Sequence, residues 1–232
     1  MLRKAAADCA NCRNCSLYRN ATQAVFGQGD AHARVMLVGE QPGNAEDLAG
    51  EPFVGPAGAL LTEALNEAGL RREKVYVTNA VKHFSFIERG KHRLHKKPTT
   101  TEVMACKPWL IEEIGIVRPA VVVALGATAA YSLFGSSLRL TRDRGQVVSR
   151  PLPELGGLPL KALLTFHPAA VLRAPTSERR QELRALLVAD LALAAQEGRR
   201  AGWAEADATV TAPRLTARRP RRSSDAARPP HG

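Results

Sequence analysis

The chain has 232 residues, 45% of them hydrophobic, and a formal net charge of +11. This length suits one large domain, and no apolar run approaches the roughly 18–20 residues of a membrane helix, so we expect a soluble cytosolic protein with no membrane partner. The residues after position 200 contribute only +3 of the charge, which leaves +8 on the first 200. A folded domain this basic favours nucleic acid as its partner, although a merely basic surface remains an alternative.

The first half of the chain predicts two strands and one helix. The first thirty or so residues are predicted to be irregular and contain a cysteine-rich turn, "CANCRNC". A buried strand at "RVMLVGE" is followed by a polar loop, a helix over about 57–70 and a second strand at "KVYVTNAV". Next comes "ERGKHRLHKKP", Glu88 to Pro98, which concentrates six basic side chains between Lys91 and Lys97 and is predicted to be a solvated loop.

The second half alternates helices and strands. A helix at "TTTEVMACKPWLIEEIGIV" begins with a threonine cap, a buried strand follows at "PAVVVALG", and a short helix at "ATAAYSLFG". Strands are predicted at "GQVVS" and "LKALLTF", and a long amphipathic helix at "TSERRQELRALLVADLALAAQEG". This alternation predicts one α/β domain over residues 1–200, with a mostly parallel, doubly wound sheet between two helical layers. Residues 203–232 are predicted to be a disordered basic tail.

Active sites of such sheets lie at the carboxyl ends of the strands. Three loops fall at such ends: one opens with Gly39 and Glu40, one runs from Asn79 to Pro98, and one contains His167. From the residues alone, Asn79 could cap a turn and His167 could be an ordinary loop histidine. Their placement nevertheless predicts one site built from all three loops.

The four cysteines are Cys9, Cys12, Cys15 and Cys106. Their clustering in a cytosolic chain favours metal or cluster ligation over disulfides. The spacing of Cys12 and Cys15 alone also fits zinc, redox chemistry or no function. A closed site needs four ligands, and the remaining position could be filled by His83 or by Cys9.

Several motifs together resemble the iron–sulfur uracil-DNA glycosylases, family four and its relatives. These are "CRNCSLYRNATQAVFGQGDAHARVMLVGEQPG", "EPFVGPAGALL", "VYVTNAVKH", "EVMACKPWLIEEI" and "HPAAVLR", in the family's order over about residues 9–195. The resemblance implies the uracil-DNA glycosylase fold, a role in DNA repair by base excision, and a 4Fe–4S cluster. It also implies the cluster ligands Cys12, Cys15, His83 and Cys106, with Cys9 as a spare. The UdgX subgroup has a histidine at the His83 position, followed by a basic insert.

The resemblance also assigns the pocket residues. Phe53 matches the aromatic residue that stacks on uracil, although by itself it could be a core residue. Asn79 matches the amide that reads the pyrimidine edge, and His167 matches a donor to the uracil oxygen. The remaining implied binding or catalytic residues belong to the first motif and to the end of the last one: Gly39, Glu40, Gln41, Pro42, Gly43, Asn44 and Arg173. UdgX members commonly have an aspartate where this chain has Asn44, which keeps the capacity to hydrogen-bond but lacks the charge of a general base.

The basic loop matches the "KRRIH" motif of UdgX, whose terminal histidine captures the sugar carbon C1′. By that resemblance, His95 is the nucleophile and Arg93 holds the loop or a phosphate. The other basic residues, Lys91, His92, Lys96 and Lys97, are interpreted as solvated or as contacts to DNA phosphates. We therefore expect a monomeric, nucleoid-associated bacterial enzyme that acts on uracil in single-stranded DNA and becomes covalently attached. The alternatives are a hydrolytic glycosylase of the same fold and a non-catalytic iron–sulfur DNA-binding protein.

Overall fold

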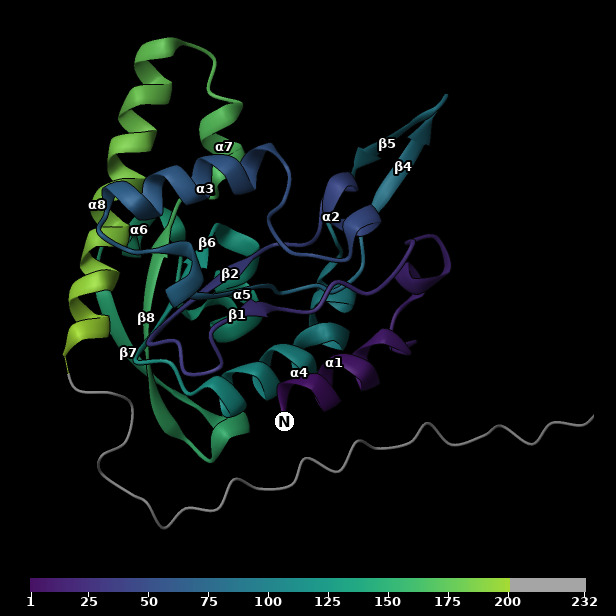
Figure 1. Ribbon diagram of the computed structural model, residues 1–232, viewed down its shortest axis with the longest axis horizontal. Helices are drawn as coiled ribbons and strands as arrows, with labels where there is room; N and C mark the ends of the chain where they lie inside the picture. The colour runs from purple at the N-terminus through teal and green to yellow at the C-terminus, as the bar shows by residue number, and fades with distance from the viewer. Residues whose placement is uncertain (201–232) are drawn as a thin grey trace, which may run out of the picture.

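The computed structural model describes residues 1–200 and centres on a six-stranded sheet with the strand order β1-β3-β2-β6-β8-β7 (Figure 1). The four inner strands are parallel, and both edge strands are antiparallel to their neighbours. The strands are β1 (Gln28–Gly29), β2 (Val35–Gly39), β3 (Tyr76–Asn79), β6 (Val121–Leu125), β7 (Val147–Leu152) and β8 (Leu158–Thr165). The predicted α/β domain with a mostly parallel sheet is confirmed. The predicted tail, 203–232, lies outside the described residues.

Helices cover both faces of this sheet (Figure 1). One layer contains α3 (Pro56–Glu67), α7 (Pro168–Leu172) and α8 (Ser177–Arg199); the other contains α1 (Leu2–Ala10), α4 (Thr100–Val117) and α5 (Ala127–Phe134). Short helices α2 (Asn44–Ala49) and α6 (Leu140–Asp143) and 3₁₀ turns at Ser16–Arg19, Arg72–Lys74, Gly135–Ser137 and Pro153–Leu155 complete the chain. Within residues 1–200, no helix combines the length and apolarity that crossing a membrane requires.

Alternation along the buried strands builds two cores. In β2, Met36 and Val38 pack in the core beneath α4 and α5, while Val35 and Leu37 pack in the core beneath α3 and α8. Strand β2 is buried on both faces, which is why "VMLVG" contains no polar side chain. The two cores fix the central strands in place, and the loops at the carboxyl ends of these strands can form a site.

The predicted helix starts agree with the structure. Thr99 caps α4 by accepting the Glu102 N–H at 3.3 Å, and the Glu102 carboxylate accepts the Thr99 N–H at 2.7 Å. Thr176 caps α8 in one direction only, by accepting the Arg179 N–H at 3.2 Å. Both caps satisfy backbone donors that a helix start would otherwise leave unpaired.

Two segments differ from the prediction. Residues 2–10 form the regular helix α1, so the expectation of an irregular N-terminus was wrong there. The basic segment is a hairpin, β4 (Phe86–Arg89) and β5 (His92–His95), that projects from the body of the molecule (Figure 1). Its tight turn places Gly90 at a φ of 60°, a conformation that glycine adopts without steric cost. The charges are solvated because the hairpin is exposed, and its backbone is ordered because the strands pair.

Candidate functional site

A cavity of about 490 Å³ opens at the carboxyl edge of the sheet. The loops after β2, β3, β6 and β8 and the base of the hairpin form its walls. The sequence predicted several lining residues: Glu40, Gln41, Gly43, Phe53, Asn79, His95, His167 and Arg173. The loops predicted to meet at this edge therefore do meet, and the loop after β6 joins them.

One end of the cavity is a slot suited to a flat ring. The rings of Phe53 and His167 stack with centroids 5.8 Å apart and an angle of 28° between their planes. The buried Oδ1 of Asn79 lies beside them and has no hydrogen-bond partner among the described residues. Gly39 allows the side chains of Asn79 and Phe53 to lie against its backbone, because a Cβ at Gly39 would lie 2.3 Å from Asn79 Oδ1 and 2.6 Å from Phe53 Cζ. The slot thus combines an aromatic face with an unused acceptor.

His167 is poised as a neutral hydrogen-bond donor. Burial, followed by the charges of Arg173 and His95, lowers the pKa of His167 to about 4. Its Nδ1 accepts the Ala169 N–H at 3.1 Å, as the N-cap of α7, so the proton of the neutral ring is on Nε2. A neutral N–H donor in a buried site can stabilise negative charge that develops on a bound ring.

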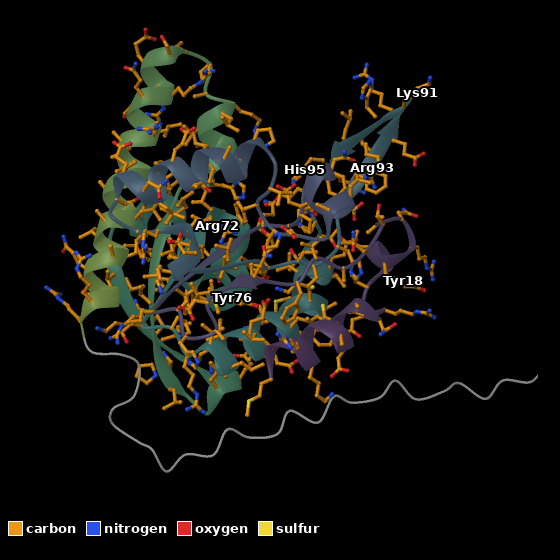
Figure 2. The ribbon with its side chains drawn as sticks, viewed as in Figure 1. Tyr18, Arg72, Tyr76, Lys91, Arg93 and His95 are labelled. Atoms are coloured by element: carbon orange, nitrogen blue, oxygen red, sulfur yellow. The ribbon has the colours of Figure 1, made fainter. Side chains whose placement is uncertain are left out.

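The hairpin register decides which histidine faces the cavity. His95 pairs with Phe86 and Arg93 pairs with Glu88, so these side chains share the face toward the body. His92 pairs with Arg89 and belongs to the opposite face. In Figure 2, Lys91 lies at the tip of the hairpin, and His95 lies at its base, nearer the sheet. The structure therefore places His95, and not His92, at the cavity.

His95 is next to a carboxylate that is itself held in place. Its Nε2 lies 3.4 Å from Glu40 Oε1, with the His95 side chain 50% exposed. The other Glu40 oxygen accepts the hydroxyl of Thr128, which is at the start of α5. The backbone also fixes Glu40, since its carbonyl accepts the Val81 N–H at 3.0 Å. A histidine beside a positioned carboxylate is an arrangement suited to nucleophilic or general-base chemistry.

Gln41 fastens the base of the hairpin. Its Nε2 donates to the carbonyls of Ser85 at 3.0 Å and Lys96 at 3.1 Å, and its Oε1 accepts the Ser85 N–H at 3.0 Å. Ser85 directly precedes β4 and Lys96 directly follows β5. Although Gln41 lines the cavity as predicted, its amide is committed to this backbone, and its role is to position the strand that carries His95.

Arg93 holds the hairpin against α2. Its guanidinium donates to Asn44 Oδ1 at 2.7 Å and to Asp47 Oδ2 at 2.7 Å, and it lies over the rings of Phe84 and Phe86. Asp47 is fully buried and also accepts the Thr22 N–H. Arg93 and Asn44 therefore act away from the cavity wall, as does Pro42, which does not line it.

Sequence reasoning missed three residues that support the site. Thr128 holds Glu40, and Asp47 holds Arg93. Glu46 joins two loops by accepting the N–H groups of Gly43 at 3.0 Å and Gly55 at 2.9 Å. Thr128 follows the carboxyl end of β6 and could have been found by the same rule as the other three loops. No pattern distinguishes Glu46 and Asp47 from ordinary surface acids in "NAEDLAG".

Three thiols gather between the N-terminal segment and α4. Burial is the largest cause that raises the pKa of the Cys106 thiol to about 12; the nearby Cys12 and Cys15 act in the same direction, whereas Lys82 opposes them. The Cys106 sulfur accepts the Lys82 N–H at 3.1 Å, and the Cys12 sulfur accepts the Trp109 Nε1–H at 3.1 Å. Buried thiols with donors aimed at their sulfurs are a suitable environment for thiolate ligands of an iron–sulfur cluster.

The fourth ligand position is contested between two residues. Cys9 is fully buried, and burial is the main cause that raises the pKa of its thiol. Lys82 lowers this pKa, whereas the nearby thiols of Cys106 and Cys12 raise it. His83 is also buried, which lowers its pKa, and the charge acting on it is that of Asp47. Within residues 1–200, no three His, Cys, Asp or Glu side chains converge tightly enough for a single metal ion. A cubane cluster has different requirements, because each of its ligands binds a separate iron.

Comparisons with known proteins agree with this architecture. A type-4 uracil-DNA glycosylase of Thermotoga maritima is 41% identical over 181 residues, covering 78% of this chain and 85% of the relative. One from Pyrobaculum aerophilum is 42% identical over 166 residues, covering 71% and 81%. One from Archaeoglobus fulgidus is 40% identical over 169 residues, covering 71% and 80%. The family model for the uracil DNA glycosylase superfamily matches residues 26–192, and the chain belongs to that superfamily.

Proposed function

We propose that this protein is a UdgX-type uracil-DNA glycosylase that excises uracil from DNA and becomes covalently linked to the abasic sugar through His95. The observation that carries the covalent step is the position of His95 on the cavity face of the hairpin, with its Nε2 3.4 Å from Glu40 Oε1. The names of the relatives support the excision of uracil. The covalent step depends on this chain's own hairpin.

In this slot, the face of Phe53 would pack on a uracil that has been rotated out of the DNA stack, with His167 at the edge of the uracil ring. Asn79 offers its free Oδ1 to the uracil N3–H and its amide N–H to the adjacent carbonyl. His167 donates from Nε2 to a uracil oxygen, where negative charge grows as the base departs. The hydrogen bonds that are donated to uracil oxygens strengthen as the bond breaks, which is the requirement for catalysis.

In the proposed reaction, the C1′–N1 bond of deoxyuridine breaks and its electron pair leaves on uracil N1. The sugar carbon then has oxocarbenium character. Glu40 first takes the proton from His95 Nε2, and the lone pair that this frees forms the bond to C1′. The same proton later passes from Glu40 to the uracil anion, so neutral uracil is released. An N-alkylated imidazole is a poor leaving group, so the protein remains attached and acts once.

The second candidate is a hydrolytic glycosylase of the same family. It is favoured by the three relatives described above, all of which are type-4 uracil-DNA glycosylases. In that case Glu40 would deprotonate a water molecule that attacks C1′, and His95 would only contact DNA. A non-catalytic DNA-binding protein would not need the aligned slot formed by Phe53, Asn79 and His167.

The test uses purified protein, a single-stranded oligonucleotide with one uracil, and a denaturing gel. The proposal expects a heat- and detergent-stable band of protein joined to DNA, with yield limited to one per protein molecule. His95→Ser should abolish this band, whereas His92→Ser, on the opposite face of the same hairpin, should retain it. Free abasic DNA formed over many turnovers by the wild type would establish the hydrolytic alternative. An adduct that survives His95→Ser would refute the assigned nucleophile.

We also infer that the chain holds a 4Fe–4S cluster through Cys12, Cys15, His83 and Cys106. The gathered thiols support three of these ligands: Cys12 and Cys106 are buried, and Cys15 is partly buried. The cluster would supply a structural link between the N-terminal segment, the turn after β3 and α4. A cluster with one imidazole carries less negative charge than one with four thiolates, which raises its reduction potential.

Iron content and visible absorption test this inference without any measurement of activity. Cys106→Ser should lose both, whereas His83→Cys should retain both, because it restores a thiolate ligand. Cys9→Ser should leave them unchanged if Cys9 is a spare. Loss of iron in Cys9→Ser together with retention in His83→Ala would instead make Cys9 the fourth ligand.

The proposed setting is uracil in single-stranded DNA of the bacterial nucleoid, acted on by a monomer. The projecting hairpin presents Lys91 and other basic side chains where a DNA backbone would pass (Figure 2). A comparison of adduct yield on single-stranded and duplex oligonucleotides tests the strand preference. Equal or higher yield on the duplex would contradict it, and sedimentation of free protein tests the monomeric state.

A further inference from the structure

A second cavity of about 310 Å³ adjoins the first. The two share three wall residues: Lys97, Ala127 and Thr128. Beyond this shared wall, the second cavity is lined by the ring of Tyr131, by the apolar side chains of Val103 and Leu138, and by Arg139. Whatever occupies the first cavity therefore has an immediate neighbouring site.

The second cavity combines an aromatic ring with unpaired cations. Tyr131 is on α5 and packs on one side against Val103 and Cys106, and the ring is only partly buried. Lys97 and Arg139 are exposed, and in the described part of the chain neither side chain makes an ion pair or donates a hydrogen bond. No acidic side chain lines this cavity within residues 1–200. A partner with a flat ring and a negative charge suits it.

We propose that the second cavity is a subsite for the nucleotide adjacent to the uridine. Its base would pack against Tyr131, and its phosphate would lie between Lys97 and Arg139. This inference rests on the proposed function, because a uridine in the first cavity is joined by one phosphodiester to each neighbour, and the shared wall at Lys97 is where that phosphate would cross. Single-strand binding proteins combine the same elements, a stacking ring and a cationic path.

The experiment removes the base of one neighbour while keeping its sugar and phosphate. Three oligonucleotides carry a single uracil: one has normal neighbours, one has a tetrahydrofuran abasic analogue on the 5′ side, and one has it on the 3′ side. Base stacking on an aromatic side chain corresponds to roughly 5- to 150-fold in binding. We therefore expect one of the two analogues to lower the single-turnover rate of uracil release at limiting protein by about tenfold or more.

Protein variants tie this effect to Tyr131. Tyr131→Leu should reduce the rate on the normal oligonucleotide and should no longer distinguish it from the abasic analogue. Tyr131→Phe is the matched control, because it retains the ring and should retain the discrimination. Arg139→Gln should weaken binding to all three oligonucleotides alike and should lower the salt dependence of binding. Thermal unfolding of each variant identifies any that fails to fold.

The outcomes separate this inference from the proposed function. Uracil release that is equal on all three oligonucleotides would overturn the subsite and leave the glycosylase intact. Discrimination that persists in a folded Tyr131→Leu protein would also overturn it. Absence of uracil release from every oligonucleotide would refute the proposed function itself.

Discussion

The Asn79 side chain has a buried carbonyl oxygen with no partner in the described residues. An unsatisfied buried acceptor costs about 1–3 kcal/mol, so a ligand that fills this position is stabilised by relieving it. Asn79→Asp removes the amide donor and adds negative charge. We expect uracil excision to fall by roughly 10- to 100-fold in single-turnover assays, in line with the loss of such a hydrogen bond. Asn44→Asp, on α2 outside the cavity wall, is the control and should change excision little.

A pH prediction follows from His167. Its folded-state pKa of about 4 is below the ordinary value of 6.5, so between these values the unfolded chain binds more protons than the folded protein. Stability is therefore lost as the pH falls from 6.5 to 4, by at most about 3 kcal/mol from this group. Urea unfolding should show that the free energy of unfolding falls less between pH 6.5 and pH 4 in His167→Gln than in the wild type. Parallel losses in both proteins would contradict the prediction.

Single residues mark the limit of prediction from the sequence. The alternation of motifs placed Asn79 and His167 at one edge, because the carboxyl ends of parallel strands share that edge. The backbone of Phe53 has a φ of 59°, which is rare for a non-glycine residue and depends on its whole surroundings. The hydrogen bonds from Gln41 to carbonyls at the base of the hairpin could not be predicted either, because an amide in a polar loop has many possible partners.

Among the elements, the hairpin depends on one anchor. Arg93 joins it to Asp47 and Asn44, and charge-assisted hydrogen bonds of this kind contribute about 1.5–3 kcal/mol. Arg93→Met should therefore increase amide exchange in residues 86–95 by roughly 10- to 100-fold and slow adduct formation. Lys91→Met, at the tip (Figure 2), is the matched control and should leave exchange at the base unchanged. Unaltered exchange in Arg93→Met would show that another contact holds the hairpin.

The Lys82–Glu113 ion pair links the turn after β3 to α4. Both side chains are fully buried, their charged atoms are 2.6 Å apart, and Lys82 also donates to the carbonyl of Asn79 at 2.8 Å. Lys82→Met leaves a buried carboxylate without its counter-charge, so we expect a loss of about 3–5 kcal/mol in the free energy of unfolding. The control is Lys107→Met, which breaks a more exposed pair with Glu154 and should cost about 1 kcal/mol or less. Equal losses in urea unfolding would disprove the distinction.

Elements were predictable where local signals and burial agree. The capped start of α4 and the apolar run of β6 are visible in "TTTEV" and "VVVAL", and both were placed correctly. The hairpin was missed because its charge dominated the interpretation, although "FIERGKHRLH" contains a two-residue turn at Gly90 and Lys91. Helix α1 lacks such signals, because it is only nine residues long and Met1 provides no side-chain cap.

At the scale of the whole molecule, the same end of the sheet collects the cavity, the hairpin and the basic surface. Four parallel strands end there, so residues far apart in sequence, such as Glu40 and Thr128, become neighbours. The buried strands beneath them leave this edge little freedom to shift. A reaction that needs a base, a sugar carbon and a nucleophile in register benefits from such a rigid support.

The last prediction concerns the distribution of charge. Residues 1–200 carry +8 of the net +11, and every residue of the cavity and hairpin lies among them. A protein truncated after residue 200 should therefore form the adduct at an unchanged maximal rate. Its affinity for uracil-free single-stranded DNA should fall at low salt and approach that of the full chain at high salt, because the lost +3 acts through counterion release. Fluorescence anisotropy across a salt series measures this difference. Equal salt slopes for the two proteins would show that residues 201–232 do not contact DNA.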